Sequence, residues 1–123
     1  MATPGLDFIE AMERAVGSGN IEEAVKYLRE DVSYTVGAQT SRRGIDAVVA
    51  YAREQEQRAR WDGHTVQNVT RADNLLVVEV LSHFTRVVDG ARVTFPCADF
   101  YRFVEGRIQD WRVYAGMCPI QAT

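Results

Sequence analysis

Residues 92–116 read RVTFPCADFYRFVEGRIQDWRVYAG, and this stretch decides the fold. Two β-prone runs, Val93 to Val104 and Arg107 to Tyr114, flank a Glu105-Gly106 turn, which is the short-range pattern of a β-hairpin. Because side chains alternate along a strand, Asp99 shares one face with apolar and aromatic neighbours. A solvated carboxylate has no reason to lie there. Asp99 is therefore the first candidate functional residue, and its predicted neighbours on that face are Cys97, Tyr101 and Phe103.

The composition is that of an ordinary globular domain. The 123 residues are 46% hydrophobic and 25% charged, with a net charge of −3, which predicts one domain over 1–123. Basic residues are scattered, so no nucleic-acid partner is expected. No apolar run approaches the roughly 18 residues of a membrane span, and the N-terminus lacks the pattern of a signal peptide. We therefore expect a cytoplasmic protein without a membrane partner.

The cysteines and histidines do not suggest a metal centre. Cys97 and Cys118 are the only cysteines, and a reducing compartment favours free thiols over a disulfide. His64 and His83 are far apart in the sequence, and neither a CxxC nor an HExxH pattern is present. Neither a metal nor another cofactor is expected.

Helical patterns fill the first half of the chain. Apolar spacing predicts a first helix over 6–16, which the Gly17-Ser18-Gly19 segment ends. Asn20 is placed to cap a second helix, whose buried stripe runs from Ile21 to Leu28. A third helix is predicted from Ile45 to Arg60.

The second half is β throughout. Strands are predicted over His64–Arg71 and Leu75–Val88, and the opening hairpin completes an antiparallel meander of four strands. Val32 to Val36 supplies a further strand. Helices followed by a long sheet predict an α+β fold with the helices on one sheet face.

Several motifs carry a resemblance to a known superfamily over nearly the whole chain. They are Gly19-Asn20-Ile21-Glu22-Glu23, Leu28-Arg29-Glu30-Asp31-Val32, Arg43-Gly44-Ile45, the run from Phe100 to Ile108, and Trp111-Arg112-Val113-Tyr114. With them the chain resembles the nuclear transport factor 2-like proteins, which include ketosteroid isomerases, limonene epoxide hydrolases and SnoaL-like polyketide cyclases. The resemblance implies a cone of three N-terminal helices on a strongly curved, mostly antiparallel sheet that encloses one pocket. It also implies a homodimer formed through the outer sheet face.

The comparison with ketosteroid isomerases assigns one of three catalytic roles. Asp99 matches the isomerases' oxyanion-hole acid, which an apolar site keeps protonated. The general base of these enzymes would fall on Val36, and their oxyanion tyrosine would fall on Met12. Two roles are thus missing, which argues against a simple steroid isomerase.

The epoxide hydrolases provide a second comparison. Tyr34 matches their water-positioning tyrosine, but Val36 replaces the partner asparagine. Their Asp-Arg-Asp relay would fall on Ser82, Val80 and Val113, and valine cannot accept a proton from water. The SnoaL-like branch tolerates varied catalytic residues and remains the favoured comparison.

Extending the alternation from Asp99 across the sheet predicts the lining of a site for a small hydrophobic molecule. Tyr34 and Tyr101 are natural hydrogen-bonding partners for Asp99, although packing alone would also explain them. The remaining predicted lining residues are Val36, Val80, Ser82, Phe84, Cys97, Trp111 and Val113, with Met12 from the first helix and Tyr51 and Trp61 near the mouth.

The chain has two histidines, His64 and His83. Alternation places His83 on the face opposite Ser82 and Phe84, which favours a role at an interface. A slip of one residue in pairing would instead make His83 the best general base in the chain. His64 begins its strand near a turn and is expected to be solvated.

These observations support a cofactor-independent enzyme that transfers protons on a hydrophobic carbonyl compound, by isomerisation, cyclisation or elimination. Asp99 would be the acid or base, with Tyr34 and Tyr101 orienting the substrate. Three alternatives remain open: a non-catalytic module that binds a small ligand or a partner, a structural dimer with a collapsed pocket, and an activity like that of the epoxide hydrolases.

Overall fold

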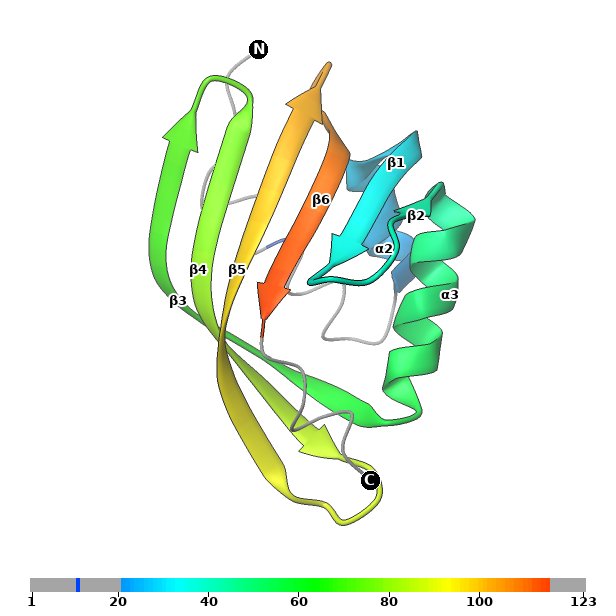
Figure 1. Cartoon of the computed structure of the whole chain (residues 1–123), viewed down its shortest axis with the longest axis vertical. Helices are drawn as coiled ribbons and strands as arrows, with labels where there is room; N and C mark the ends of the chain where they lie inside the picture. Colours follow the sequence, from blue (N-terminus) through cyan, green and yellow to red (C-terminus); the bar gives the residue numbers. More distant parts are fainter. Residues whose placement is uncertain (1–10, 12–20, 116–123) are drawn as a thin grey trace.

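The structure is a computed structural model that describes Ala11 and residues 21–115. It has an α+β architecture, with one curved sheet and short helices along one side of it (Figure 1). The helical elements are α2 (Ile21–Ala24), the 3-10 turn η1 (Val25–Tyr27) and α3 (Ile45–Glu56). The strands are β1 (Leu28–Val36), β2 (Arg42–Arg43), β3 (Ala59–Ala72), β4 (Leu75–Arg86), β5 (Arg92–Val104) and β6 (Arg107–Ala115).

The sheet is mixed, with the strand order β2-β1-β6-β5-β4-β3. The predicted antiparallel meander is confirmed in β3 to β6. β1 lies parallel to β6, and β2 pairs antiparallel with β1. β1 therefore lies beside β6, at the edge of the β5–β6 hairpin, and β2 forms the edge of the sheet beyond β1.

The predicted hairpin turn follows from its residues. Glu105 and Gly106 have φ values of 53° and 81°, so both central positions of the turn lie in the left-handed region. Such turns match the twist of antiparallel strands and favour glycine at the second position. The turn sets the pairs Val104–Arg107 and Phe103–Ile108, and a register shift between Arg102 and Phe103 then pairs Asp99 with Val113.

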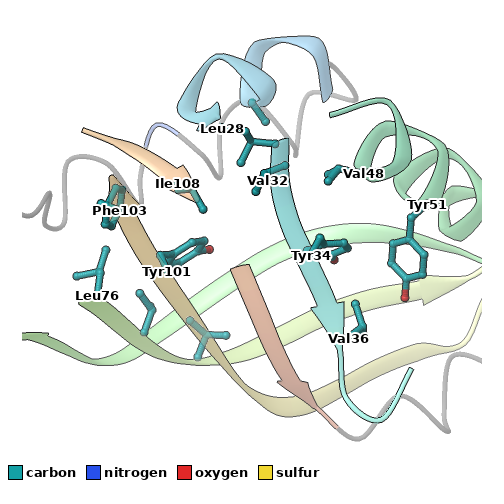
Figure 2. Packing of buried hydrophobic residues seen from close by; sticks show 13 residues of the cluster. Leu28, Val32, Tyr34, Val36, Val48, Tyr51, Leu76, Tyr101, Phe103 and Ile108 are labelled. Carbon is teal, nitrogen blue, oxygen red and sulfur yellow. The ribbon is translucent and has the colours of Figure 1, made fainter. Parts of the chain in front are cut away.

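The hydrophobic core lies between α3 and one face of the sheet, which we call the inner face (Figure 2). Leu76 of β4 and Ile108 of β6 are both fully buried there, with relative exposures of 0%. Tyr51 of α3 packs against Tyr34 of β1, with their rings edge-on and 5.6 Å between the centroids. Figure 2 also labels Leu28, Val32, Val48 and Phe103, which belong to the same hydrophobic core.

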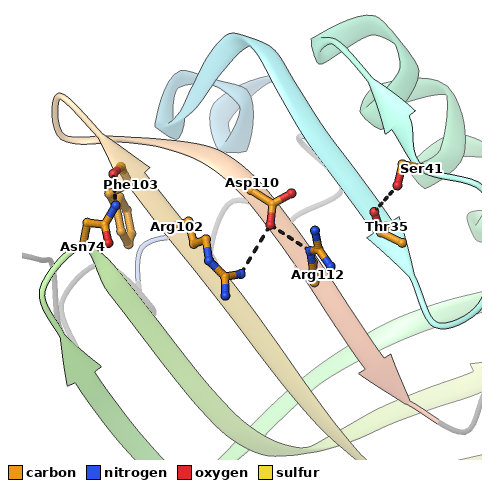
Figure 3. A network of polar contacts seen from close by, with 7 residues as sticks. All are labelled: Thr35, Ser41, Asn74, Arg102, Phe103, Asp110 and Arg112. Atoms are coloured by element: carbon orange, nitrogen blue, oxygen red, sulfur yellow. Dashed lines mark hydrogen bonds and ion pairs between the residues drawn. The ribbon is translucent and has the colours of Figure 1, made fainter.

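Charged side chains lie on part of the outer face of the sheet, opposite the inner face. Asp110 of β6 lies between two arginines, with its Oδ2 3.5 Å from Arg102 Nη1 and 3.0 Å from Arg112 Nε (Figure 3). Arg112 is exposed on this face. Exposed ion pairs of this kind contribute little to stability, so this network adds little to the stability of the fold.

Three element boundaries of the first half differ from prediction. The first predicted helix lies outside the described residues except for Ala11, and the second is only the four-residue α2 followed by η1. β1 begins at Leu28 instead of Val32, because Leu28 pairs with Ile108 of β6. The helix α3 ends at Glu56 instead of Arg60, because Ala59 and Arg60 already pair with β4.

The β3–β4 region also differs. β3 begins at Ala59 instead of His64, and its pairing with β4 is interrupted near Asp62 and near Gln67. β4 ends at Arg86, two residues before the predicted end, because Val87 and Val88 are exposed in the turn to β5. None of the described helices combines the length and hydrophobicity that a membrane crossing requires.

Candidate functional site

The strand register places the predicted lining residues on the inner face. Cross-strand partners point to the same side of a sheet, so the pairs in the register define continuous rows. One row runs Arg42, Tyr34, Trp111, Tyr101, Leu76, and the next runs Val36, Val113, Asp99, Val78. Cys97 with Val80, Ser82 with Phe95, and Phe84 with Val93 continue the same face along β4 and β5.

Asp99 lies at the centre of this face and is 4% exposed. Ser82 and Asp99 are the buried polar or charged residues among those described. Burial raises the pKa of the Asp99 carboxyl from its ordinary 3.8 to about 6, while a hydrogen bond from Trp111 opposes the rise. Trp111 Nε1 donates this bond to Asp99 Oδ1 over 3.2 Å, and it is the one hydrogen bond that the described residues give to the carboxyl group.

Aromatic rings surround Trp111 and hold it in place. Its ring centroid lies 4.7 Å from that of Tyr34 and 5.4 Å from that of Tyr101. With Tyr51, these rings form what we call the aromatic cluster. The sequence left open whether Tyr34 and Tyr101 bond to Asp99 or only pack. In the described residues both rings pack against the indole, and the indole N–H donates to the acid.

Among Asp99, Tyr34 and Cys97, Asp99 has the pKa nearest to neutrality. Burial raises the pKa of Tyr34 well above its ordinary 10, so its hydroxyl remains protonated at neutral pH. Burial, with the nearby Asp99 charge, raises the pKa of Cys97 to about 12. A thiol that keeps its proton is a poor nucleophile, so Cys97 serves this face as an apolar lining residue.

His64 was expected to be solvated, and this expectation was wrong. The interruption of pairing at Asp62 shifts the alternation of β3, and His64 becomes the cross-strand partner of Ser82 on the inner face. Its ring meets Trp61 edge-on at 4.8 Å, and burial lowers its pKa to about 4. Gly63, with φ of 111°, is the sequence signal for the irregularity, because glycine within a strand often marks a bulge.

His83 lies on the outer face, as the alternation predicted. Its Nε2 is 2.8 Å from Thr65 Oγ1 and its Nδ1 is 2.9 Å from Thr94 Oγ1, so threonines on β3 and β5 hold both ring nitrogens. The slip in pairing that would have turned His83 toward Asp99 does not occur. The condition under which His83 would be the general base is therefore not met.

The remaining predicted site residues fall as follows. Tyr51 lies in α3 and contacts Tyr34, whereas Trp61 belongs to β3 and pairs with Phe84. Phe84 stacks on Phe95 with 5.5 Å between ring centroids. Met12 lies outside the described residues. Within residues 21–115 and at Ala11, no three His, Cys, Asp or Glu side chains gather in a way that could hold a metal ion.

A family model described as the SnoaL-like domain matches residues 9–111 of the chain. The chain belongs to the SnoaL-like domain family. A search of curated proteins found no match.

Solved structures support the SnoaL-like, nuclear transport factor 2-like fold. An NTF2-like protein of unknown function from Burkholderia pseudomallei is 17% identical, with a TM-score of 0.83 over 95% of this chain and 96% of that one. A candidate polyketide cyclase from Pseudomonas putida is 17% identical, with a TM-score of 0.76 over 92% and 94%. An LEH-like epoxide hydrolase from M. tuberculosis is 18% identical, with a TM-score of 0.75 over 93% and 84%. At these identities the similarity concerns the fold.

Proposed function

We propose that this SnoaL-like protein is a cofactor-independent enzyme that transfers protons on a hydrophobic, carbonyl-bearing substrate. The observation that carries the proposal is the buried Asp99 carboxyl, whose pKa is about 6. A proton acceptor works best when its pKa lies near the operating pH, and burial is a usual way to raise a carboxyl to that range. The reaction classes that fit are isomerisation, aldol-type cyclisation and dehydration.

The proposed chemistry uses Asp99 as a base and then as an acid. Ionised Asp99 removes a proton from the carbon beside a substrate carbonyl, and the electron pair of that C–H bond moves to form an enolate. The carboxyl group then holds the proton and returns it to another carbon or to a leaving oxygen. Since Trp111 holds Oδ1, we assign the proton transfer to Oδ2.

Tyr34 is the proposed donor to the enolate oxygen. Its raised pKa keeps the hydroxyl protonated, and a hydrogen bond to the oxygen stabilises charge that develops during proton removal. Tyr101 and the apolar residues of the inner face would orient the hydrophobic part of the substrate. These include Val36, Val78, Val80, Val113 and Phe84.

Hydrogen exchange at carbon tests this proposal directly. Wild-type protein is incubated in D2O with a panel of enolisable ketones, and the loss of the α-proton signal is followed by NMR. Asp99→Asn should slow enzyme-catalysed exchange by about 100-fold to 10,000-fold, as for the loss of a general base. The control is Glu79→Gln, because Glu79 is exposed on β4 next to Val78, the cross-strand partner of Asp99.

The same assay separates catalysis from simple binding. If the ketones bind with micromolar to millimolar affinity but wild type and Asp99→Asn exchange no deuterium, the protein is a binding module. Equal exchange rates for wild type and Asp99→Asn would remove Asp99 from the mechanism.

We also propose that two copies associate through the outer face. Tyr114 of β6 is 49% exposed there, and its ring meets Phe100 edge-on at 5.3 Å between centroids. Exposed aromatic rings of this kind are enriched at protein interfaces. Sedimentation should give a dimer for wild type and a monomer for Tyr114→Glu, whereas identical sedimentation of both proteins would contradict the proposal.

A further inference from the structure

Arg42 is the cation that borders the inner face next to the aromatic cluster. It lies on β2 opposite Tyr34 of β1, so both side chains point to the same side of the sheet. This places the guanidinium at the end of the row that continues through Tyr34 and Trp111 to Tyr101. Arg43, its neighbour in the strand, points the other way and is exposed.

Two contacts fix the half-buried Arg42 side chain. Its Cζ lies 4.1 Å above the centroid of the Tyr51 ring on α3, a cation–π arrangement. Its Nη1 donates a hydrogen bond to Gln39 Oε1 over 3.0 Å. Two contacts from different segments hold the charge in one place, which is the condition for a binding group rather than a solvated one.

No carboxylate among the described residues pairs with Arg42. Most other arginines in the same ranges have an acidic partner, and those paired are Arg29, Arg53, Arg58, Arg60, Arg86, Arg102 and Arg112. A charge that is partly removed from water without a counter-charge is unfavourable, and an anionic ligand would relieve the cost. Only one of the five guanidinium N–H donors is used by Gln39, which leaves donors for a bidentate partner.

The field of the guanidinium reaches the hydroxyl groups of the site. Burial raises the pKa values of Tyr34 and Tyr51, and Arg42 opposes the rise at both. Asp99 lies farther away, since β2 and β5 are separated by β1 and β6. Three strand spacings of about 4.8 Å separate Arg42 from Asp99 by about 14 Å across the sheet, and Asp99 lies one row farther along the strands. The two groups are therefore placed to contact different parts of one ligand.

We propose that Arg42 binds a carboxylate of the substrate, so that the site accepts hydrophobic oxo acids in preference to neutral ketones. The carboxylate would lie against Arg42 beside Tyr51, and the reacting carbonyl would lie near Asp99, with the aromatic cluster between them. The position of the carbonyl near Asp99 rests on the proposed function. The position of the carboxylate rests only on the contacts and charge of Arg42.

The test uses an isosteric pair of probes, 2-naphthoate and 2-naphthamide, at pH 8. Binding is followed by calorimetry and by the fluorescence of Trp61 and Trp111, both on the inner face. We expect wild type to bind the acid at least 10-fold more tightly than the amide. Arg42→Gln should lose that preference, and Arg42→Lys should keep part of it because the charge remains while the planar fork is lost.

The matched control is Arg43→Gln, which removes the same charge from the opposite face of β2. It should bind both probes as wild type does, and circular dichroism should show that all three variants are folded. Equal binding of acid and amide by wild type would overturn the proposal, even if Arg42→Gln failed to fold. Equal weakening of acid binding by Arg42→Gln and Arg43→Gln would also overturn it, because the effect would then be one of net charge.

The outcome is separable from the test of catalysis. Loss of acid preference in Arg42→Gln with no effect of Asp99→Asn on proton exchange would support the anion site and refute the proposed reaction. Exchange that depends on Asp99, with no preference for acid over amide, would support the reaction and refute the anion site.

Discussion

Replacing Asp99 by asparagine should stabilise the protein at neutral pH while it abolishes the proposed chemistry. The carboxyl is buried, and ionising it there is unfavourable. Asparagine has nearly the same shape, keeps an oxygen that can accept the Trp111 N–H, and carries no charge to bury. The variant should therefore escape an energetic cost that wild type bears.

The size and sign of the effect follow from the raised pKa. The carboxyl ionises near 3.8 in the unfolded chain and near 6 in the folded one, so the folded state binds more protons between these values. Wild-type stability should fall as pH rises through this window, and it stays lower above it. At about 1.4 kcal/mol per pH unit, the full loss is about 3 kcal/mol. Roughly 2 kcal/mol of this should appear between pH 4.5 and 7.5.

Urea unfolding of both proteins at pH 4.5 and 7.5 measures the effect. The quantity of interest is the free energy of unfolding of Asp99→Asn minus that of wild type, in which the other titrating groups largely cancel. That difference should increase by roughly 2 kcal/mol between pH 4.5 and pH 7.5, because wild type loses stability over this range and the variant does not. A difference that does not change with pH, or that moves in favour of wild type, would refute the reasoning.

Three further predictions concern single contacts and groups. Trp111→Phe removes the N–H whose hydrogen bond lowers the pKa of Asp99, so this pKa should increase beyond about 6. The pH dependence of hydrogen exchange on the ketone should then shift to higher pH, and an unchanged profile would contradict the assigned hydrogen bond. The His64 ring should titrate with a midpoint near 4 by NMR, and a midpoint above 6 would show that the ring is solvated. Ile108→Ala should lower the free energy of unfolding, measured with urea, by about 2–5 kcal/mol because Ile108 is fully buried. Val88→Ala in the exposed turn should change it by less than about 0.5 kcal/mol. Equal losses in the two variants would contradict the assignment of Ile108 to the core.

The part of the fold that depends on local patterns could be predicted from the sequence. The alternation in β5 placed Asp99 and Tyr101 on one face, and the Glu105-Gly106 turn set the start of the pairing of β5 with β6. Because a pattern of period two is read directly from the residue types, the inner face of β4 and β5 followed from it. The facing of Trp111 and Val113 in β6 also depends on the register shift between Arg102 and Phe103.

Contacts between distant segments could not be predicted in the same way. Arg29, Glu30 and Asp31 show no alternation, yet β1 includes them because Leu28 pairs with β6. The segment after α3 has helical composition but pairs with β4 from Ala59 onward. In both places the hydrogen bonds of a neighbouring strand outweigh local propensity.

The composition of the site was predicted better than its contacts. The residues of the aromatic cluster were named, but the donor to Asp99 proved to be Trp111 because the indole N–H reaches across one strand spacing. His64 was missed because an irregularity in β3 reverses the alternation before it. The Arg42-Arg43 pair is visible in the sequence as a possible anion-binding group, but a strand of two residues has no alternation that shows which arginine faces the site.

The most direct test of the account is a titration of Asp99 itself. Protein labelled with 13C at the aspartate carboxyl carbons would be followed by NMR between pH 3 and 9, and the Asp99 signal would be assigned by its absence from Asp99→Asn. We predict a midpoint near 6 for this carbon. A midpoint at or below about 4, the value of a solvated aspartate, would contradict the claim that burial makes this carboxyl a proton acceptor at neutral pH.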